Sequence, residues 1–201
     1  MTDDATMPDS RASGASEARV ASELGERYEV MELLGRGGMG EVRLARDRRI
    51  DREVAVKMMR TVADEVTMAR FFREARVQGR LDHPAVVPIH DLGVDAGGNP
   101  YFVMKRLDGI TLADVINPKD PELAAKWPRR KLLTRFVDLC LAIQFAHERD
   151  VIHRDIKPAN LMLGEHGEAY VLDWGLARVI GDRRIEGDAA TPTADEPDAT
   201  Q

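Results

Sequence analysis

The sequence predicts an α+β fold in two parts, an antiparallel sheet that carries one main helix and a mainly helical part that follows it. Short stretches that alternate apolar and polar residues dominate residues 28–105, as is typical of strands that bury one face. Residues 67–81 and 129–149 instead place apolar residues at helical spacing. A chain of 201 residues suffices for one large domain or two small lobes with a core.

The expected elements lie between two end segments without periodicity. Residues 1–26, rich in Ala, Ser, Asp and Glu, are expected to form a disordered leader, and residues 181–201 are expected to be disordered as well. The many apolar residues of the helix at 129–149 predict a strongly buried element within the second part, residues 108–180. The first part, residues 27–107, holds the helix at 67–81 and strands expected at 28–34, 40–45, 53–58, 86–92 and 101–105.

Composition and charge exclude several classes of protein. With 43% apolar and 32% charged residues and no uninterrupted apolar run, the chain reads as soluble and without a membrane span. Its acidic start lacks the apolar core of a secretory leader, so a cytoplasmic location is expected. The single cysteine, Cys140, excludes an internal disulfide and is expected in the core. The formal net charge of −6 argues against a nucleic-acid partner.

Three glycines, Gly35, Gly37 and Gly40, form a G-x-G-x-x-G pattern between two expected strands. A dinucleotide-binding turn would need a helix after the glycines, whereas residues 41–45 alternate as a strand does. A glycine-rich hairpin can lie over a polyphosphate, because the missing side chains let backbone N–H groups approach the phosphate oxygens. The alternative is a merely flexible hairpin.

A lysine follows a small residue on the next expected strand. Residues two apart on a strand share a face, so Ala55 leaves room for a flat ring beside Lys57. Glu74, on the expected helix, could hold Lys57 in an ion pair. The alternatives are a solvated lysine and an ordinary surface glutamate.

Two polar clusters follow the long helix. Asp155, Lys157 and Asn160 lie within six residues, framed by apolar segments, and could respectively accept a hydroxyl proton, neutralise a phosphoryl group and offer an oxygen to a metal ion. Asp173 interrupts the apolar run at residues 171–177, which taken alone predicts a strand end and a turn. Together these groups are the parts that phosphoryl transfer requires.

The motifs occur in the order and approximate spacing of the protein-kinase signature set. They are Gly35-x-Gly37-x-x-Gly40-x-Val42, Val54-Ala55-Val56-Lys57, Glu74, His153-Arg154-Asp155-Ile156-Lys157-Pro158-Ala159-Asn160 and Asp173-Trp174-Gly175. With them the chain resembles the bacterial Hanks-type serine/threonine protein kinases over roughly residues 28–180. The resemblance implies a two-lobed fold, with a sheet-based N-lobe and a mainly helical C-lobe, and transfer of phosphoryl groups from ATP to Ser or Thr hydroxyls of proteins.

The resemblance also implies a role for each site residue, with ATP and Mg²⁺ as cofactors. Lys57 would contact the α and β phosphates and pair with Glu74. Asp155 would be the catalytic base beside Lys157, a lysine that disfavours a tyrosine-specific enzyme. The Mg²⁺ ions would be held by Asn160 and Asp173.

The remaining roles concern the adenine and the residues around Asp173. The adenine would be enclosed by Val42, Ala55, Met104 and Met162 and would meet backbone groups of Lys105 and Leu107. Trp174 stands where the family usually has Phe and would fill the same apolar slot behind the helix that carries Glu74. Arg154 would pair with a phosphorylated threonine, for which Thr191 and Thr193 are the nearest candidates.

The family continues past the metal-binding aspartate with an activation segment, an Ala-Pro-Glu-like anchor and further helices, but nothing after Gly175 resembles this anchor. The resemblance therefore predicts a kinase truncated within the activation segment, an incomplete C-lobe and an exposed apolar patch through which the chain could associate. Two hypotheses follow, a serine/threonine kinase or a non-catalytic nucleotide-binding or regulatory module that docks on another protein. A small-molecule kinase is disfavoured by Lys157-Pro158.

Overall fold

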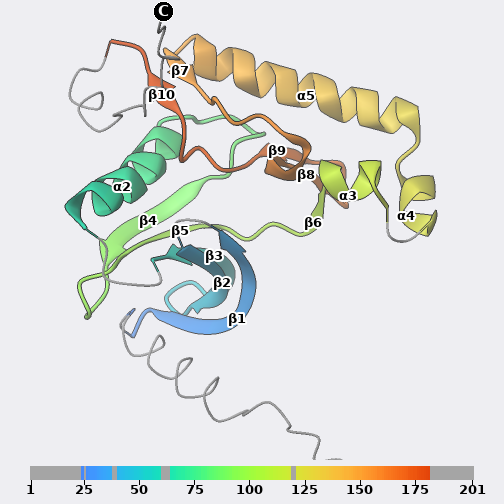
Figure 1. The fold of residues 1–201 in the computed structure, drawn as a ribbon. Helices are drawn as coiled ribbons and strands as arrows, with labels where there is room; N and C mark the ends of the chain where they lie inside the picture. The colour runs from blue at the N-terminus through green and yellow to red at the C-terminus, as the bar shows by residue number, and fades with distance from the viewer. Residues whose placement is uncertain (1–23, 25, 38–39, 60–63, 119–120, 182–201) are drawn as a thin grey trace, which may run out of the picture.

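A computed structural model describes residues 24, 26–37, 40–59, 64–118 and 121–181. The two end segments predicted to be disordered lie almost wholly outside these residues. The described chain forms two lobes, with a curved sheet in one and the longest helix at the far side of the other (Figure 1), which confirms the predicted two-lobed α+β fold. Among the described helices, none has the length and apolar character needed to cross a membrane.

The N-terminal lobe contains all five strands that the sequence predicts. They pair antiparallel in the order β1-β2-β3-β5-β4. The fourth strand begins at Ile89, three residues later than predicted, because Val86 instead forms an isolated parallel bridge with Val171 of the other lobe. The strands are β1 (Tyr28–Gly37), β2 (Gly40–Asp47), β3 (Arg52–Met58), β4 (Ile89–Val94) and β5 (Pro100–Lys105).

Successive side chains of β3 lie on opposite faces of this sheet. Val54, Val56 and Met58 are buried in one cluster with Tyr28 and Val103. Lys57, between two of them, is only partly buried and lies on the opposite face. The face that the sequence predicts for Lys57 is therefore confirmed.

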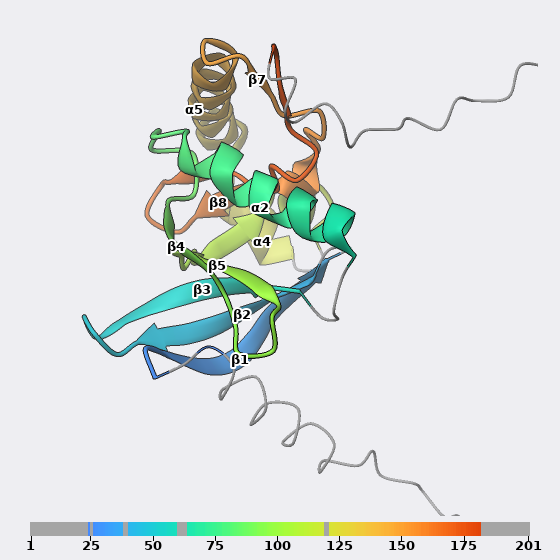
Figure 2. The same ribbon diagram turned by 90° about the vertical axis from the view of Figure 1, so that its left-hand side faces the viewer.

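Helix α2 (Glu65–Gly79) contributes to the cores of both lobes. It begins at Glu65, two residues before the predicted start, and Asp64 caps it by accepting a hydrogen bond from the backbone N–H of Thr67. Phe71 packs with Phe102 of β5, while Val77 belongs to the core of the C-terminal lobe. Figure 2 shows α2 between the sheet and α5.

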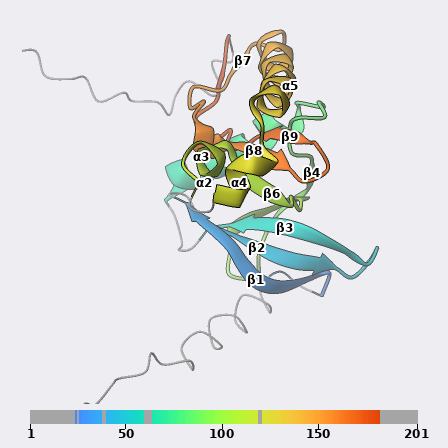
Figure 3. The ribbon, with the colours of Figure 1, turned by 90° about the vertical axis from the view of Figure 1, so that its right-hand side faces the viewer.

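Three residues join β5 to β6, and we call residues 105–108 the hinge. Beyond it, two small sheets form, with the strand orders β6-β8-β9 and β7-β10. Figures 1 and 3 place α3 beside β6. The elements of this lobe are β6 (Gly109–Thr111), α3 (Leu112–Ile116), α4 (Pro121–Lys126), α5 (Arg129–His147), β7 (Val151–Ile152), a 3₁₀ turn η1 (Pro158–Asn160), β8 (Leu161–Gly164), β9 (Ala169–Val171) and β10 (Arg178–Val179).

Helix α5 corrects the prediction of a strongly buried helix. Its buried residues are Leu139, Ala142 and Ala146, which face β7 and β9. Cys140, expected in the core, is exposed. The helix carries apolar residues around most of its circumference, but only one face packs against the described chain. Four large apolar side chains are more than half exposed as a result: Leu133, Phe136, Val137 and Leu141.

Candidate functional site

The glycine-rich hairpin joins β1 to β2, with Gly37 opposite Gly40. A Cβ atom on Gly40 would lie 2.1 Å from the carbonyl oxygen of Met58, so the close approach of β3 requires glycine there. A Cβ atom on Gly35 or Gly37 would meet nothing within 4 Å. Packing within the described chain therefore does not require these two glycines, and the open space lets a ligand approach the backbone.

Lys57 and Glu74 form an ion pair between β3 and α2. The Lys57 Nζ lies 2.5 Å from Oε1 of Glu74, whose side chain is only 3% exposed. The alternative of an ordinary surface glutamate is therefore wrong. Burial raises the pKa of the Glu74 carboxyl above its ordinary value, and the ammonium group of Lys57 offsets part of this rise.

The second oxygen of Glu74 faces the turn that contains Asp173. This Oε2 atom is buried and has no hydrogen-bond partner within the described chain. A Cβ atom on Gly175 would lie 3.3 Å from it and 3.1 Å from Oδ1 of Asp173. The negative charge of Asp173 also contributes to the raised pKa of Glu74. The N-terminal ion pair and Asp173 thus share one site.

Asp155 is held by two neighbouring side chains. Lys157 donates from Nζ to Oδ2 of Asp155 over 2.7 Å, and Asn160 donates from Nδ2 to the same oxygen over 3.0 Å. Asn160 also donates to the backbone carbonyl of Asp155 over 2.9 Å. The hydrogen bond from Lys157 lowers the pKa of Asp155, so this carboxylate stays ionised in a fixed orientation.

Backbone hydrogen bonds join this loop to the segment before Asp173. The N–H of Leu172 donates to the carbonyl of Asn160 over 2.8 Å. His153, which is buried, lies 2.9 Å through Nε2 from the carbonyl of Leu172 and accepts the N–H of Asp155 at Nδ1. His153 belongs to the sequence motif, but the sequence alone indicated no role for it. The structure shows that it links the Asp155 loop to the segment before Asp173.

Trp174 fills an apolar slot, as predicted. It is 1% exposed and belongs to the same core cluster as Val77 of α2. Its ring lies 4.6 Å from that of His153, edge to face. Next to it, Asp173 has a φ of 58°, and Arg154 has a φ of 65°. A left-handed backbone conformation costs energy in a residue other than glycine, and both of these residues lie at the site.

The residues predicted to enclose adenine come from both lobes. Ala55 pairs with Met104 across β3 and β5, and Met162 lies on β8. The backbone N–H of Lys105 already donates to the carbonyl of Pro88 over 3.1 Å. Of the two backbone groups of Lys105, the carbonyl is therefore the one expected to meet the adenine. Val42 pairs with Lys57 across β2 and β3, and Leu107 lies in the hinge.

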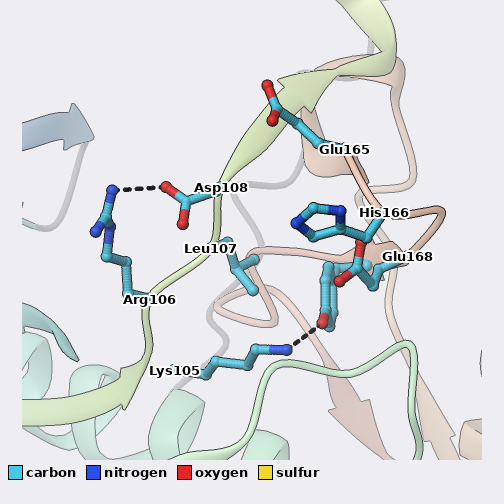
Figure 4. A pocket seen from close by; sticks show the side chains of 8 residues that line it. Lys105, Arg106, Leu107, Asp108, Glu165, His166 and Glu168 are labelled. Carbon is cyan, nitrogen blue, oxygen red and sulfur yellow. Dashed lines mark hydrogen bonds and ion pairs between the residues drawn. The ribbon is translucent and has the colours of Figure 1, made fainter. Parts of the chain in front are cut away.

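The structure adds one residue that sequence reasoning missed. The Nζ of Lys105 donates to the hydroxyl of Tyr170 on β9 over 2.5 Å, marked by a dashed line in Figure 4. No motif in the sequence points to this tyrosine. A cavity of about 220 Å³ opens beside the contact and does not coincide with the space between Lys57 and Asp155. It is lined by Lys105, Arg106, Leu107, Asp108, Glu165, His166, Glu168 and Tyr170.

The side chains of Asn160 and Asp173 fit a magnesium site whose other ligands would be water and phosphate. In the part of the chain that the structure describes, no three His, Cys, Asp or Glu side chains gather as a metal site. Mg²⁺ usually takes only one or two protein ligands together with water and substrate phosphates. Asn160 and Asp173, which the Leu172 hydrogen bond brings close, offer such a pair. Thr191 and Thr193, the predicted partners of Arg154, lie outside the described residues.

Comparisons with known proteins agree on one family. The protein kinase domain model matches residues 28–193. The chain is 43% identical to serine/threonine-protein kinase PknB of Mycobacterium tuberculosis over 178 residues, which cover 86% of this chain and 27% of that protein. It is 42% identical to PknB of Mycolicibacterium smegmatis, covering 85% and 27% of the two chains. It is also 42% identical to a probable serine/threonine-protein kinase of Streptomyces coelicolor, covering 79% and 24%. The chain thus spans about a quarter of the length of these relatives.

Proposed function

The chain belongs to the protein kinase family, and on that premise we propose that it transfers phosphoryl groups from ATP to Ser or Thr hydroxyls of proteins. One observation carries the proposal. The Lys57–Glu74 ion pair is formed while backbone hydrogen bonds hold the Asp155 loop against the segment before Asp173. Phosphoryl transfer depends mainly on positioning and charge stabilisation, and this arrangement provides both.

We propose that the nucleotide lies between the glycine-rich hairpin and β8. The backbone around Gly35, Gly37 and Gly40 would approach the phosphates, and the ammonium of Lys57 would contact the α and β phosphates. The adenine would lie against the apolar side chains and meet the carbonyl of Lys105 and the backbone of Leu107. The apolar side chains around the adenine would be those of Val42, Ala55, Met104 and Met162. Support for the place of the phosphates comes from the open space above Gly35 and Gly37.

We propose that Asp155 orients the acceptor hydroxyl and receives its proton. Its lowered pKa keeps it ionised, and Asn160 fixes its orientation. Lys157 would neutralise charge on the transferred group, and Asn160 and Asp173 would hold Mg²⁺, which when bound neutralises the charge of the phosphates. A cytoplasmic location, where ATP is available, stays part of this proposal.

The first experiment is the intact mass of the chain after incubation with Mg²⁺ and ATP, alone and with a Ser/Thr-containing protein. Phosphate is expected on the parent chain or on the added protein, and not with Asp155→Ala. The Lys57→Ala variant is expected to bind ATP more weakly than the parent. If neither protein gains phosphate while circular dichroism shows a folded parent chain, the proposal of catalysis is wrong.

A second candidate function is a regulatory module that docks on another protein. The exposed apolar face of α5, with Leu133, Phe136, Val137 and Leu141, favours it. The two functions differ in their dependence on Asp155, because docking through α5 would be unchanged by Asp155→Ala.

A further inference from the structure

The side chain of Lys105 spans the two lobes at the hinge. Lys105 is the last residue of β5 in the N-terminal sheet. Its Nζ donates to the hydroxyl of Tyr170 over 2.5 Å and lies 5.0 Å from the centre of the same ring. Tyr170 is only 5% exposed, so most of its surface is shielded from water. A charge-assisted hydrogen bond of this kind is stronger than one between neutral groups.

Tyr170 belongs to the short strand that leads to Asp173. In β9 it pairs with Met162 of β8, so the two side chains share a face. The next residue, Val171, donates its N–H to the carbonyl of Ala85 over 2.8 Å. The strand is therefore attached to the N-terminal part of the chain at two consecutive residues, once through a side chain and once through the backbone.

We propose that Lys105 and Tyr170 form a positioning pair. This pair fixes β9, the strand that leads to Asp173, relative to the hinge that would contact the adenine. This inference rests on the proposed function. The hinge would hold the adenine end of ATP, and Asp173, three residues after Tyr170, would hold the Mg²⁺ at its phosphate end. The pair sets the relative position of these two ends, so it matters only for a ligand that contacts both.

The test measures by calorimetry the affinities of the parent and of single-residue variants for two ligands, adenosine and MgATP. Tyr170→Phe removes only the hydroxyl, and Lys105→Met removes the donor from an exposed side chain. Tyr101→Phe is the matched control, because no hydrogen bond of its hydroxyl is present among the described residues. Adenosine contacts the hinge alone, whereas ATP with Mg²⁺ contacts both ends.

Tyr170→Phe and Lys105→Met are each expected to lower the affinity for MgATP about tenfold. Tyr170→Phe, which leaves the hinge residues unaltered, is expected to keep the affinity for adenosine within about twofold of the parent's. The double variant is expected to lose no more than either single variant, because both act through one contact. Tyr101→Phe is expected to bind both ligands as the parent does.

Three results would overturn the inference. Unchanged MgATP affinity in both variants, with tight binding by the parent, would exclude the positioning pair and leave the proposed function intact. Equal losses for adenosine and MgATP in Tyr170→Phe would show that the pair only shapes the adenine pocket. A folded parent that binds no MgATP would overturn the proposed function and the inference with it.

Discussion

At the scale of single residues, two carboxylates of the site lie in opposite surroundings. Glu74 is buried on α2, and this burial raises its pKa despite the ion pair with Lys57. Asp155 is more accessible, and the hydrogen bond from Lys157 lowers its pKa. Burial disfavours the charged form of a carboxyl group, whereas a nearby cation favours it. Lys57 therefore opposes the effect of burial on Glu74, whereas at Asp155 the neighbouring cation outweighs burial and favours the ionised form.

Replacing Lys157 by methionine is therefore expected to raise the pKa of Asp155 towards the ordinary aspartate value of about 3.9. The sign follows from the contact, since the lysine stabilises the ionised form and its loss makes protonation easier. Carbon-13 NMR titration of the Asp155 carboxyl measures the shift directly. Lys126→Met, on the exposed end of α4, is the control and is expected to leave the titration unchanged. A pKa that stays low in Lys157→Met would assign the effect to Asn160 instead.

At the scale of elements, the β1–β2 hairpin uses glycine for two separate reasons. Gly40 is required by the approach of β3, whose Met58 carbonyl leaves no room for a side chain. Gly35 meets nothing in the described chain. One glycine thus serves the sheet, and the other leaves space above the strands.

The two reasons predict opposite outcomes for alanine. Gly40→Ala is expected to lower the free energy of unfolding by about 1–3 kcal/mol through overpacking. Gly35→Ala is expected to change it by no more than about 0.5 kcal/mol, while lowering the affinity for MgATP, because its methyl group occupies the space left for phosphate. Urea unfolding and calorimetry measure the two quantities. Full MgATP affinity in Gly35→Ala would contradict the proposed place of the phosphates.

At the scale of the whole molecule, the two lobes are joined by more than the hinge. Helix α2 contributes Phe71 to one core cluster and Val77 to another. Val171 of β9 bonds to Ala85 in the segment before β4. By contrast, the outward face of α5 packs against nothing in the described chain, and it presents large apolar side chains to solvent.

This face is expected to promote association of the chain with itself or with another protein. Replacing both Phe136 and Leu141 by serine is expected to reduce concentration-dependent association in analytical ultracentrifugation, with little change in the free energy of unfolding. Ile50→Ser, which alters a similarly exposed side chain on the other lobe, is the control. Equal association of the parent and the double variant would exclude this surface.

The sequence by itself determined the family and the strands of the N-terminal sheet. The alternation in β3 placed Lys57 opposite the buried Val54 and Val56, because a strand's period of two is written in consecutive residues. The motifs around Asp155 and Asp173 identified the family for a similar reason, since each depends on residue types at short spacing.

Only the tertiary structure decided what depends on distant parts of the chain. Strands of two to four residues, such as β7 and β8, are too short to show a period. The exposure of α5 depends on which of its apolar faces finds a neighbour, and helical spacing cannot show that. Lys105 and Tyr170 are 65 residues apart, and no local pattern links them. Their contact exists because the chain folds back through β8 and β9, so folding brings together what sequence spacing leaves unrelated.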